Sequence, residues 1–335
     1  MIMKYQNTVW SLFISVLLAA SATTYAVAGP GSEKSIWKNT RYESVNVPMN
    51  LVQVSPHAYY VHGPAGTPVD NEGFMSNAGV VITNEGVVVF DALGTPSLAY
   101  LLLSKIREIT DKPIVKVVVS HYHADHIYGL QVFKEQGAKI IAPNGAKKYL
   151  ASDTSKNRLK ERRKSLFPWV DENTHIVPPD HFVTEQESFK LGGLDFVITP
   201  LGSTHSDGDM MLYVKQDKVL FSGDLIFQGR IPFVAGSQPT NWINHLENLN
   251  VKGLKVIVPG HGPASTHPKE AVKFTLGYLQ FLHSKMSDAV ENLVPFDEAY
   301  KSVDWSMYKK YPAFKANHMN AYYIYLALEA SSLNN

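Results

Sequence analysis

Short apolar runs alternate with segments of helical spacing through the first half of the chain. Residues 86–90 and 114–119 are nearly unbroken hydrophobic runs, a pattern typical of strands that are buried on both faces. Between them, residues 97–109 carry leucine and isoleucine three to four positions apart, which predicts a helix with one buried side. Residues 125–136 repeat the helical pattern, and residues 138–142 return to a strand. This alternation predicts an α/β fold.

The second half of the chain adds a second series of strands and ends in helices. The length suits one large domain with a helical addition better than two equal domains. We therefore predict a domain over residues 50–290 and a C-terminal helical extension over residues 291–335. The strands of the second series are predicted at residues 189–191, 194–200, 211–214, 219–222 and 256–258, and the helices at residues 268–286 and 314–330.

The N-terminus has the pattern of a secretory signal peptide. Lys4 precedes a 12-residue apolar run at residues 9–20, and Ala26-Val27-Ala28 is a small-x-small cleavage signal. The apolar run is shorter than the ~20 residues that a spanning helix needs. We predict that residues 1–28 are removed on export and that residues 29–49 form a flexible lead-in. The mature protein is then periplasmic or secreted, without stable membrane association; an uncleaved N-terminal anchor is the alternative.

The amino-acid composition excludes several kinds of binding site and catalytic site. The chain has 31 lysines and arginines against 30 acidic residues, a formal net charge of +1, so no strong basic field predicts binding to nucleic acid. The basic run within residues 152–166 is interpreted as a solvated helix face. Cysteine is absent, which excludes disulfides, thiolate metal sites and a cysteine nucleophile. Any metal must be held by nitrogen and oxygen, and 13 histidines are present.

One string of residues concentrates ligand-type side chains. Ser120-His121-Tyr122-His123-Ala124-Asp125-His126 follows the predicted strand at residues 114–119 and opens a helix. At such a junction, His121 and His123 can point to one centre while Asp125 and His126 turn towards a neighbouring one. Four metal-ligand side chains within six residues make a metal site the favoured interpretation.

Three further candidates each follow a predicted strand. His205 lies in a Gly/Ser-rich loop, Asp224 ends the segment Phe221-Ser222-Gly223-Asp224, and His261 lies in the turn Pro259-Gly260-His261-Gly262. Asp91 ends the strand at residues 86–90. Strand ends on one side of a sheet lie together, so these distant side chains are expected to meet the central string.

This set of motifs resembles the five-motif pattern of the metallo-β-lactamase superfamily. The resemblance covers roughly residues 50–290 and implies a four-layer αββα sandwich with helices outside two packed sheets. It also implies a role for each matching residue. His121, His123 and His205 match the first metal site, Asp125, His126 and His261 the second, Asp224 the carboxylate that bridges the two metals, and Asp91 a carboxylate that supports a ligand histidine.

The resemblance implies a dinuclear metal hydrolase. Imidazoles and carboxylates suit Zn²⁺, two per chain, with iron or manganese as alternatives. A water between two metals has a pKa near 7 in place of 15.7 and can attack a carbonyl. Asp125 is the expected catalytic residue, because it would orient this nucleophile while it also binds metal.

The missing cysteine also separates branches of the superfamily. Two subclasses of true metallo-β-lactamases place a cysteine in the second site and are excluded. Gly223-Asp224-Leu225-Ile226-Phe227 resembles a strand end of glyoxalase II-like enzymes, and the tail His318-x-Asn320 resembles exported hydrolases found with sulfur-oxidation and quinoprotein systems. The expected substrate is a small β-lactam, lactone, ester or thioester. Two alternatives remain: a mononuclear iron dioxygenase acting on persulfides, and a non-enzymatic accessory protein of a periplasmic redox system.

Aromatic residues and one loop are candidates for the walls of the cleft. Residues 63–73 carry turn formers and predict an exposed loop, which with Phe74 and Met75 can form a lid. Core packing is favoured over pocket lining for four aromatic residues, Trp169, Phe227, Phe233 and Trp242.

Overall fold

The computed structural model describes residues 41–332. The predicted signal peptide and most of the predicted lead-in lie outside the described residues. These described residues cluster as one compact unit. In the part of the chain that is described, no helix is both long enough and apolar enough to cross a membrane.

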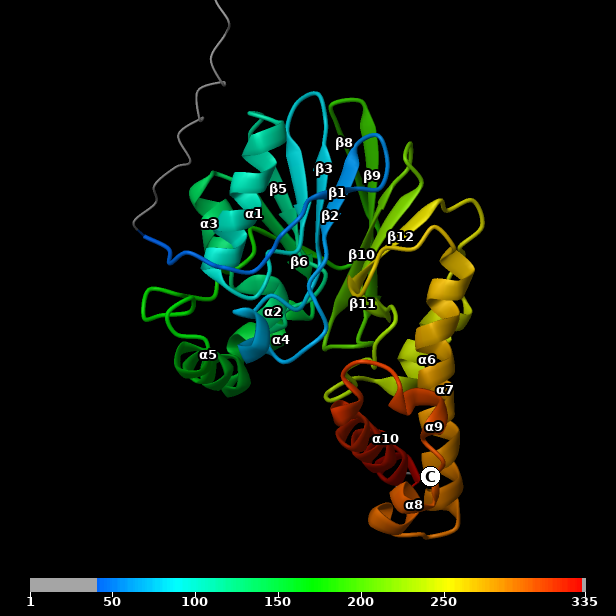
Figure 1. Cartoon of the computed structure of the whole chain (residues 1–335). Coiled ribbons are helices and arrows are strands. Elements are labelled where there is room, and N and C mark those ends of the chain that lie inside the picture. The colour runs from blue at the N-terminus through cyan, green and yellow to red at the C-terminus, as the bar shows by residue number, and fades with distance from the viewer. Residues whose placement is uncertain (1–40, 333–335) are drawn as a thin grey trace, which may run out of the picture. The chain divides into compact units, whose positions relative to one another are not determined.

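A seven-stranded sheet forms one half of the unit (Figure 1). Its strands follow chain order, and the pairs from the first to the fourth strand are antiparallel, whereas those from the fourth to the seventh are parallel. The parallel pairs explain the continuous apolar runs, because these strands are covered on both faces. The strands are β1 (Val52–Gln53), β2 (Ala58–Val61), β3 (Ala78–Ile82), β4 (Val87–Phe90), β5 (Ile114–Val118), β6 (Lys139–Pro143) and β7 (His181–Val183).

A five-stranded sheet forms the other half, in the order β12-β11-β10-β9-β8. Only the β11–β12 pair of this sheet is parallel. The strands are longer than the sequence predicts, and β11 and β12 extend as far as to include Asp224 and His261. They are β8 (Glu187–Leu191), β9 (Leu194–Gly202), β10 (Asp209–Val214), β11 (Val219–Phe227) and β12 (Val256–His261).

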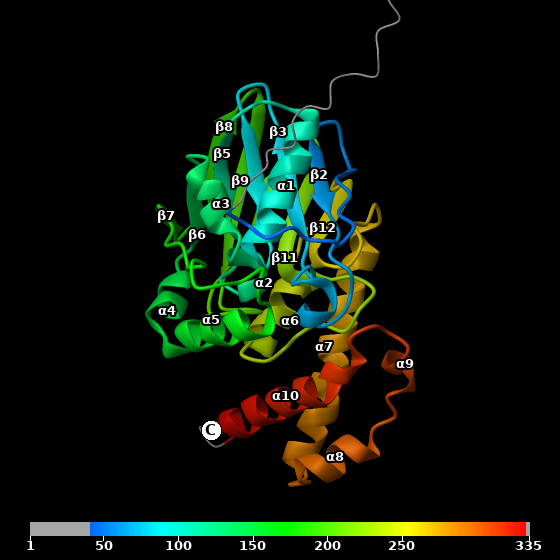
Figure 2. The same cartoon turned by 60° about the vertical axis from the view of Figure 1, so that its left-hand side comes forward.

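Helices cover the outer face of each sheet, and further helices form the C-terminal end (Figures 1 and 2). The α1 helix begins where Thr95 accepts a hydrogen bond from the Leu98 amide, with Pro96 in the first turn. The helices are η1 (Pro68–Asn71), α1 (Pro96–Ile109), α2 (Ala124–Ile127), α3 (Leu130–Glu135), α4 (Ala146–Ala151), α5 (Asp153–Ser165), α6 (Pro239–Glu247), α7 (Pro268–Glu291), α8 (Phe296–Ser302), α9 (Ser306–Lys309), η2 (Phe314–Ala316) and α10 (Asn317–Ser332).

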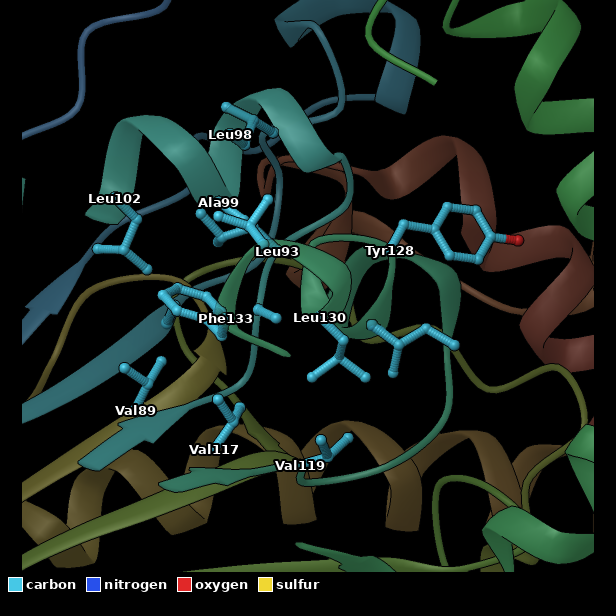
Figure 3. Packing of buried hydrophobic residues seen from close by; sticks show 14 of the residues in the cluster. Val89, Leu93, Leu98, Ala99, Leu102, Val117, Val119, Tyr128, Leu130 and Phe133 are labelled. Carbon is cyan, nitrogen blue, oxygen red and sulfur yellow. The ribbon is translucent and has the colours of Figure 1, made fainter. Parts of the chain in front are cut away.

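Three apolar clusters hold these layers together. Between the sheets, the rings of Phe90 and Phe221 lie 5.6 Å apart. Figure 3 shows Leu102 and Phe133, from α1 and α3, above Val117 of β5. On the other side, α6 and α7 cover the five-stranded sheet. The layers are therefore helix, sheet, sheet and helix, which confirms the predicted αββα sandwich with C-terminal helices.

The predicted helix over residues 125–136 is divided into α2 and α3. The break falls at Gly129, where a Cβ atom would lie 2.0 Å from the Ala92 carbonyl oxygen. The Gly129 amide donates to the Leu93 carbonyl at 3.3 Å, so the chain bends to bring the site-bearing turn against the end of β4.

The lid prediction is wrong for Phe74. Its side chain is 1% exposed and belongs to the core beneath α1. Residues 63–73 include the η1 turn, and Gly63 is buried against the backbone of Met75 and Ser76. The packing of Phe74 fixes the end of this loop in place, so that the Met75 carbonyl can face the site.

Candidate metal centre

The candidate site residues converge at one edge of the two sheets. His121 and His123 follow β5, and α2 carries Asp125 and His126. The remaining members come from the other sheet, where His205 follows β9 and Asp224 and His261 belong to β11 and β12. A hydrogen bond from the Met210 amide to the Ser120 carbonyl, at 2.9 Å, joins the two sheets beside this cluster.

Asp91 shapes the turn between β5 and α2. Its carboxylate accepts from the Ser120 amide at 2.7 Å, from the Ser120 hydroxyl at 2.8 Å and from His126 Nδ1 at 2.9 Å. Asp91 adopts a left-handed φ of 63°, and its side chain is buried. The bond to Nδ1 leaves Nε2 of His126 facing the cluster, which is how supporting carboxylates orient ligand histidines.

The first three histidines bring their ring nitrogens together. Nδ1 of His123 lies 2.9 Å from Nε2 of His121 and 3.0 Å from Nε2 of His205. One ring nitrogen carries either one proton or one lone pair, so both contacts cannot be ordinary hydrogen bonds. Such crowding of lone-pair donors fits a shared cation.

Asp125, His126 and His261 form a second group. Oδ2 of Asp125 lies 3.5 Å from Nε2 of His126 and 3.3 Å from Nε2 of His261. Nε2 of His126 is buried without a hydrogen-bond partner. These are the three residues that the family resemblance predicts for the second metal site.

Asp224 lies between the two groups. Its Oδ2 is 3.2 Å from Nε2 of His205 and 3.3 Å from Nε2 of His261. Its Oδ1 is 3.3 Å from Nε2 of His126 and has no hydrogen-bond partner. One carboxylate therefore contacts histidines of both groups, as a bridging ligand must.

Burial and mutual charge set the protonation of the cluster. Burial lowers the pKa of His205 and of His123 to about 4. Burial acts to raise the pKa of Asp224, but the neighbouring His261 and His126 outweigh it and hold that pKa well below its usual range. For His126 and His261, burial acts to lower the pKa, but Asp224 and Asp125 outweigh it and raise the pKa of both rings. Neutral imidazoles and ionised carboxylates are the forms that bind metal, so a bound metal would replace the protons on these two rings.

Asp224 and His261 occupy different local structures from those predicted. Asp224 was expected at a strand end, but it lies inside β11, at an irregular stretch of the β11–β12 pairing. His261 was expected in a turn, but it is the last residue of β12. Gly223, with a φ of 52°, produces the irregularity, and a Cβ atom there would lie 2.4 Å from the Ser120 Cβ. The strand is thus deformed to aim the carboxylate.

Aromatic rings pack behind two of the histidines. Phe227 stacks on His261 at 4.9 Å between ring centroids, and Trp242 meets His205 at 5.1 Å. Both aromatic side chains are buried, in line with core packing rather than pocket lining. Trp169 instead donates to the Ser44 carbonyl, and Phe233 is 38% exposed.

Three further residues contact the cluster or its loops. Sequence reasoning named Met75 only as part of a lid, and it missed Asn77 and Arg230. The Met75 carbonyl accepts from His261 Nδ1 at 2.7 Å. The Asn77 amide group donates to the carbonyls of Pro259 and Gly262. Arg230 is 6% exposed and approaches His261 Nδ1 to 3.4 Å. Only Arg230 gives a sequence signal, a cation six positions after Asp224.

Known proteins are similar to this chain in sequence. A family model described as the metallo-beta-lactamase superfamily matches residues 71–261. A metallo-beta-lactamase type 2 from Elizabethkingia meningoseptica is 25% identical over 193 residues, which cover 56% of this chain and 69% of that protein. A linear primary-alkylsulfatase from Pseudomonas sp. is 24% identical over 240 residues, covering 60% of this chain and 44% of that protein.

Two solved structures have folds similar to that of this chain. A metallo-beta-lactamase from Pontibacter korlensis matches with a TM-score of 0.55 at 20% identity, covering 70% of this chain and 99% of that one. A sec-alkylsulfatase from Pseudomonas sp. matches with a TM-score of 0.63 at 19% identity, covering 83% of this chain and 50% of that one. The chain thus spans about half the length of the alkylsulfatases that it matches. It is an enzyme that belongs to the metallo-beta-lactamase superfamily.

Proposed function

We propose that this protein is an exported hydrolase with two divalent metal ions, preferably zinc, that cleaves a carbonyl-centred bond of a small molecule. The observation that carries the proposal is that Asp224 contacts His205 of one three-residue group and His126 of the other. The proposed ligands are His121, His123 and His205 for one ion, Asp125, His126 and His261 for the other, and Asp224 for both.

The donor set fits such ions. It contains only imidazole nitrogens and carboxylate oxygens, which zinc accepts and which iron and manganese also accept. Nε2 of His126 and Oδ1 of Asp224 are buried without hydrogen-bond partners, and such atoms destabilise a fold unless something binds them. When bound, a metal pair supplies a hydroxide near neutral pH and polarises the carbonyl.

Residues of the chain would hold the nucleophile and the ligands in place. The Asp125 side chain is 23% exposed, more than the Asp224 or His261 side chains, so its carboxylate can meet an incoming water. In that position, the carboxylate orients the water and accepts its proton. Asp91 fixes the tautomer of His126, and the Ser120 hydroxyl, 2.9 Å from His121 Nδ1, contributes to fixing that ring.

The proposed substrates are a β-lactam, a lactone, an ester or a thioester. A sulfate ester is a second candidate, because a relative and a matched structure are alkylsulfatases and that structure covers 83% of this chain, against 70% for the lactamase. Both candidates are small molecules, and both require water as co-substrate.

Metal quantitation of three proteins, with a hydrolysis panel, tests the proposal. The wild type should hold about two zinc ions per chain. His121→Ala should mainly lose the first ion, whereas Asp224→Ala should lose both, because its oxygens contact histidines of both groups. Equal loss of a single ion in the two variants would contradict the assignment.

The panel consists of nitrocefin, a lactone, 4-nitrophenyl acetate, an acyl-thioester and 4-nitrophenyl sulfate. Hydrolysis by the zinc-loaded wild type, and its loss in Asp125→Ala, is the expected result. Oxygen consumption with a persulfide by the iron-loaded protein, without hydrolysis, would favour the dioxygenase alternative. Full biological function in Asp125→Ala would favour the accessory-protein alternative.

A further inference from the structure

The α4 and α5 helices carry a strong local positive charge. Residues 146–166, which include both helices, hold eight lysines and arginines against two acidic residues, a net charge of +6. The whole chain has a net charge of +1, so the remaining residues together carry a net charge of −5. The positive charge of this protein is therefore concentrated on one part of its surface.

Packing within the fold does not account for these cations. Ser155 is the one residue of α5 that is buried, and contacts at its two ends hold the helix. At the first end, the Ser152 hydroxyl accepts from the Ser155 amide at 3.2 Å. At the other end, Arg163 donates to the carbonyls of Asp171 and Thr174, at 2.9 and 2.6 Å. The outer face of α5 is therefore left in contact with solvent.

Three lysines form a stripe on that outer face. Lys156, Lys160 and Lys164 are spaced four residues apart, which places them on one side of the helix, and all three are exposed. Nζ of Lys156 lies 3.2 Å from Oδ1 of Asp153, whereas Lys160 and Lys164 form no ion pair within 4.0 Å among residues 41–332. Like charges at this spacing destabilise a helix. The stability of the fold thus gives no reason for the stripe.

Exposed apolar side chains lie at the C-terminal end of the stripe. Phe167, two residues after α5, is 66% exposed, and Val69 of η1 is 58% exposed. The η1 turn lies beside this end of α5, since a Cβ atom built on Gly73 would lie 3.4 Å from the Leu166 side chain. Figures 1 and 2 show α5 at the end of the sandwich where α2 also lies. Cations next to exposed apolar side chains are typical of proteins that bind the interface of anionic membranes.

We propose that the α5 patch, which consists of Lys156, Lys160, Lys164 and Phe167, docks on an anionic lipid surface. The lysine ammonium groups contact the phosphates of the headgroups, and the Phe167 ring enters the boundary between headgroups and acyl chains. The association is reversible and salt-sensitive, unlike the stable membrane association that the sequence argues against. It needs neither the metal centre nor a substrate, so it goes beyond the proposed function.

Flotation with lipid vesicles tests the proposal. At ~0.1 M salt, the wild type should bind phosphatidylcholine vesicles that contain about 30% phosphatidylglycerol, and it should bind neutral phosphatidylcholine vesicles at least ~10-fold more weakly. At ~1 M salt, the bound protein should dissociate. A variant with Lys156→Gln, Lys160→Gln and Lys164→Gln should bind the anionic vesicles at least ~30-fold more weakly, with unchanged zinc content.

A second triple variant controls for the loss of charge. Lys190→Gln, Lys215→Gln and Lys252→Gln remove three exposed lysines that lie outside α4 and α5. This variant should bind the anionic vesicles within ~3-fold of the wild type. All proteins are compared with the same N-terminus, so that the apolar run at residues 9–20, where it is retained, contributes equally to each.

The aromatic side chain distinguishes a lipid surface from an acidic protein. When anionic vesicles are added, Phe167→Trp should show a blue-shifted emission relative to the wild type, because the indole leaves water, whereas poly-glutamate should cause no such shift. Phe167→Ser should bind the anionic vesicles about 5-fold more weakly than the wild type.

Three outcomes would overturn the proposal. They are equal binding of anionic and neutral vesicles by the wild type, equal binding of anionic vesicles by the two triple variants, and an emission of Phe167→Trp that vesicles leave unchanged. The last result, with retained binding to poly-glutamate, would assign the α5 patch to an acidic protein instead. The first needs no variant, so it decides the proposal even if a variant does not fold.

Discussion

At the scale of residues, small side chains make room for the candidate ligands. Gly260 lies against Asp224, where a Cβ atom would come within 1.9 Å of Oδ1. Gly223 lies against Ser120, where a Cβ atom would come within 2.4 Å of the Ser120 Cβ. These glycines are required by close approach between strands, because only a residue without a side chain lets β12 pass the carboxylate of β11.

Gly260→Ala should displace Asp224 and reduce bound zinc by at least half, with a loss of about 1–3 kcal/mol in unfolding free energy from overpacking. Metal quantitation and urea unfolding measure both effects. Gly277→Ala in α7 is the matched control, since nothing lies within 4 Å of its built Cβ. That variant should keep its zinc and gain up to ~1 kcal/mol, because alanine favours a helix. Full zinc occupancy in Gly260→Ala would refute the prediction.

At the scale of elements, a buried aspartate ties two turns together. Asp217, between β10 and β11, accepts from the Ser55 hydroxyl and from the amide and ring nitrogens of His57, between β1 and β2. Asp217 precedes the first residue of β11, whereas Asp224 lies in the second half of that strand, so the two carboxylates are at different ends of the sheet. The contact therefore joins the two sheets independently of the metal centre.

This contact predicts a pH dependence of stability. Burial acts to raise the pKa of Asp217, but hydrogen bonds from Ser55 and His57 outweigh it and lower the pKa below 3.8. The ionised form thus stabilises the fold above pH 3.8, and the contribution is lost as pH falls through the lower folded pKa.

Asp217→Asn should cost about 1–2 kcal/mol at pH 7, the size of charge-assisted hydrogen bonds, and less below pH 3.8. Urea unfolding across this range measures the difference between variant and wild type. Asp111→Asn, an exposed residue, serves as the control and should stay close to the wild type throughout. A pH-independent difference for Asp217→Asn would show that its charge contributes nothing.

At the scale of the whole molecule, the sandwich and its C-terminal helices form one unit. Tyr278 of α7 binds Asn317 and Asn320 of α10 in a buried network, and Asn320 in turn holds the segment after Arg230. The helical extension is therefore connected to the candidate site by hydrogen bonds.

Export is the prediction at this scale that rests on sequence alone. N-terminal sequencing of protein recovered from expressing cells should find a chain that begins near Gly29, in the extracytoplasmic fraction. Replacing Ala28 with phenylalanine should block cleavage and leave the longer chain. Recovery of the wild type with Met1 intact in the cytoplasm would contradict the prediction.

The sequence by itself determined the fold class and the inventory of candidate ligands. The string from His121 to His126 lies within one strand-to-helix junction, so its chemistry is local, and apolar runs are enough to indicate two sets of strands. Domain boundaries and the roles of the ligands stay predictions.

Only the tertiary structure decided how the candidate ligands meet and what surrounds them. The place of Asp224 inside β11 depends on the irregular pairing with β12, and the burial of Phe74 depends on packing under α1. The contact of Arg230 with His261 depends on the segment after β11 meeting the end of β12, and the distant Met75 carbonyl binds the same ring nitrogen. These features arise from contacts between segments far apart in the chain, and local hydrophobic patterns do not predict such contacts.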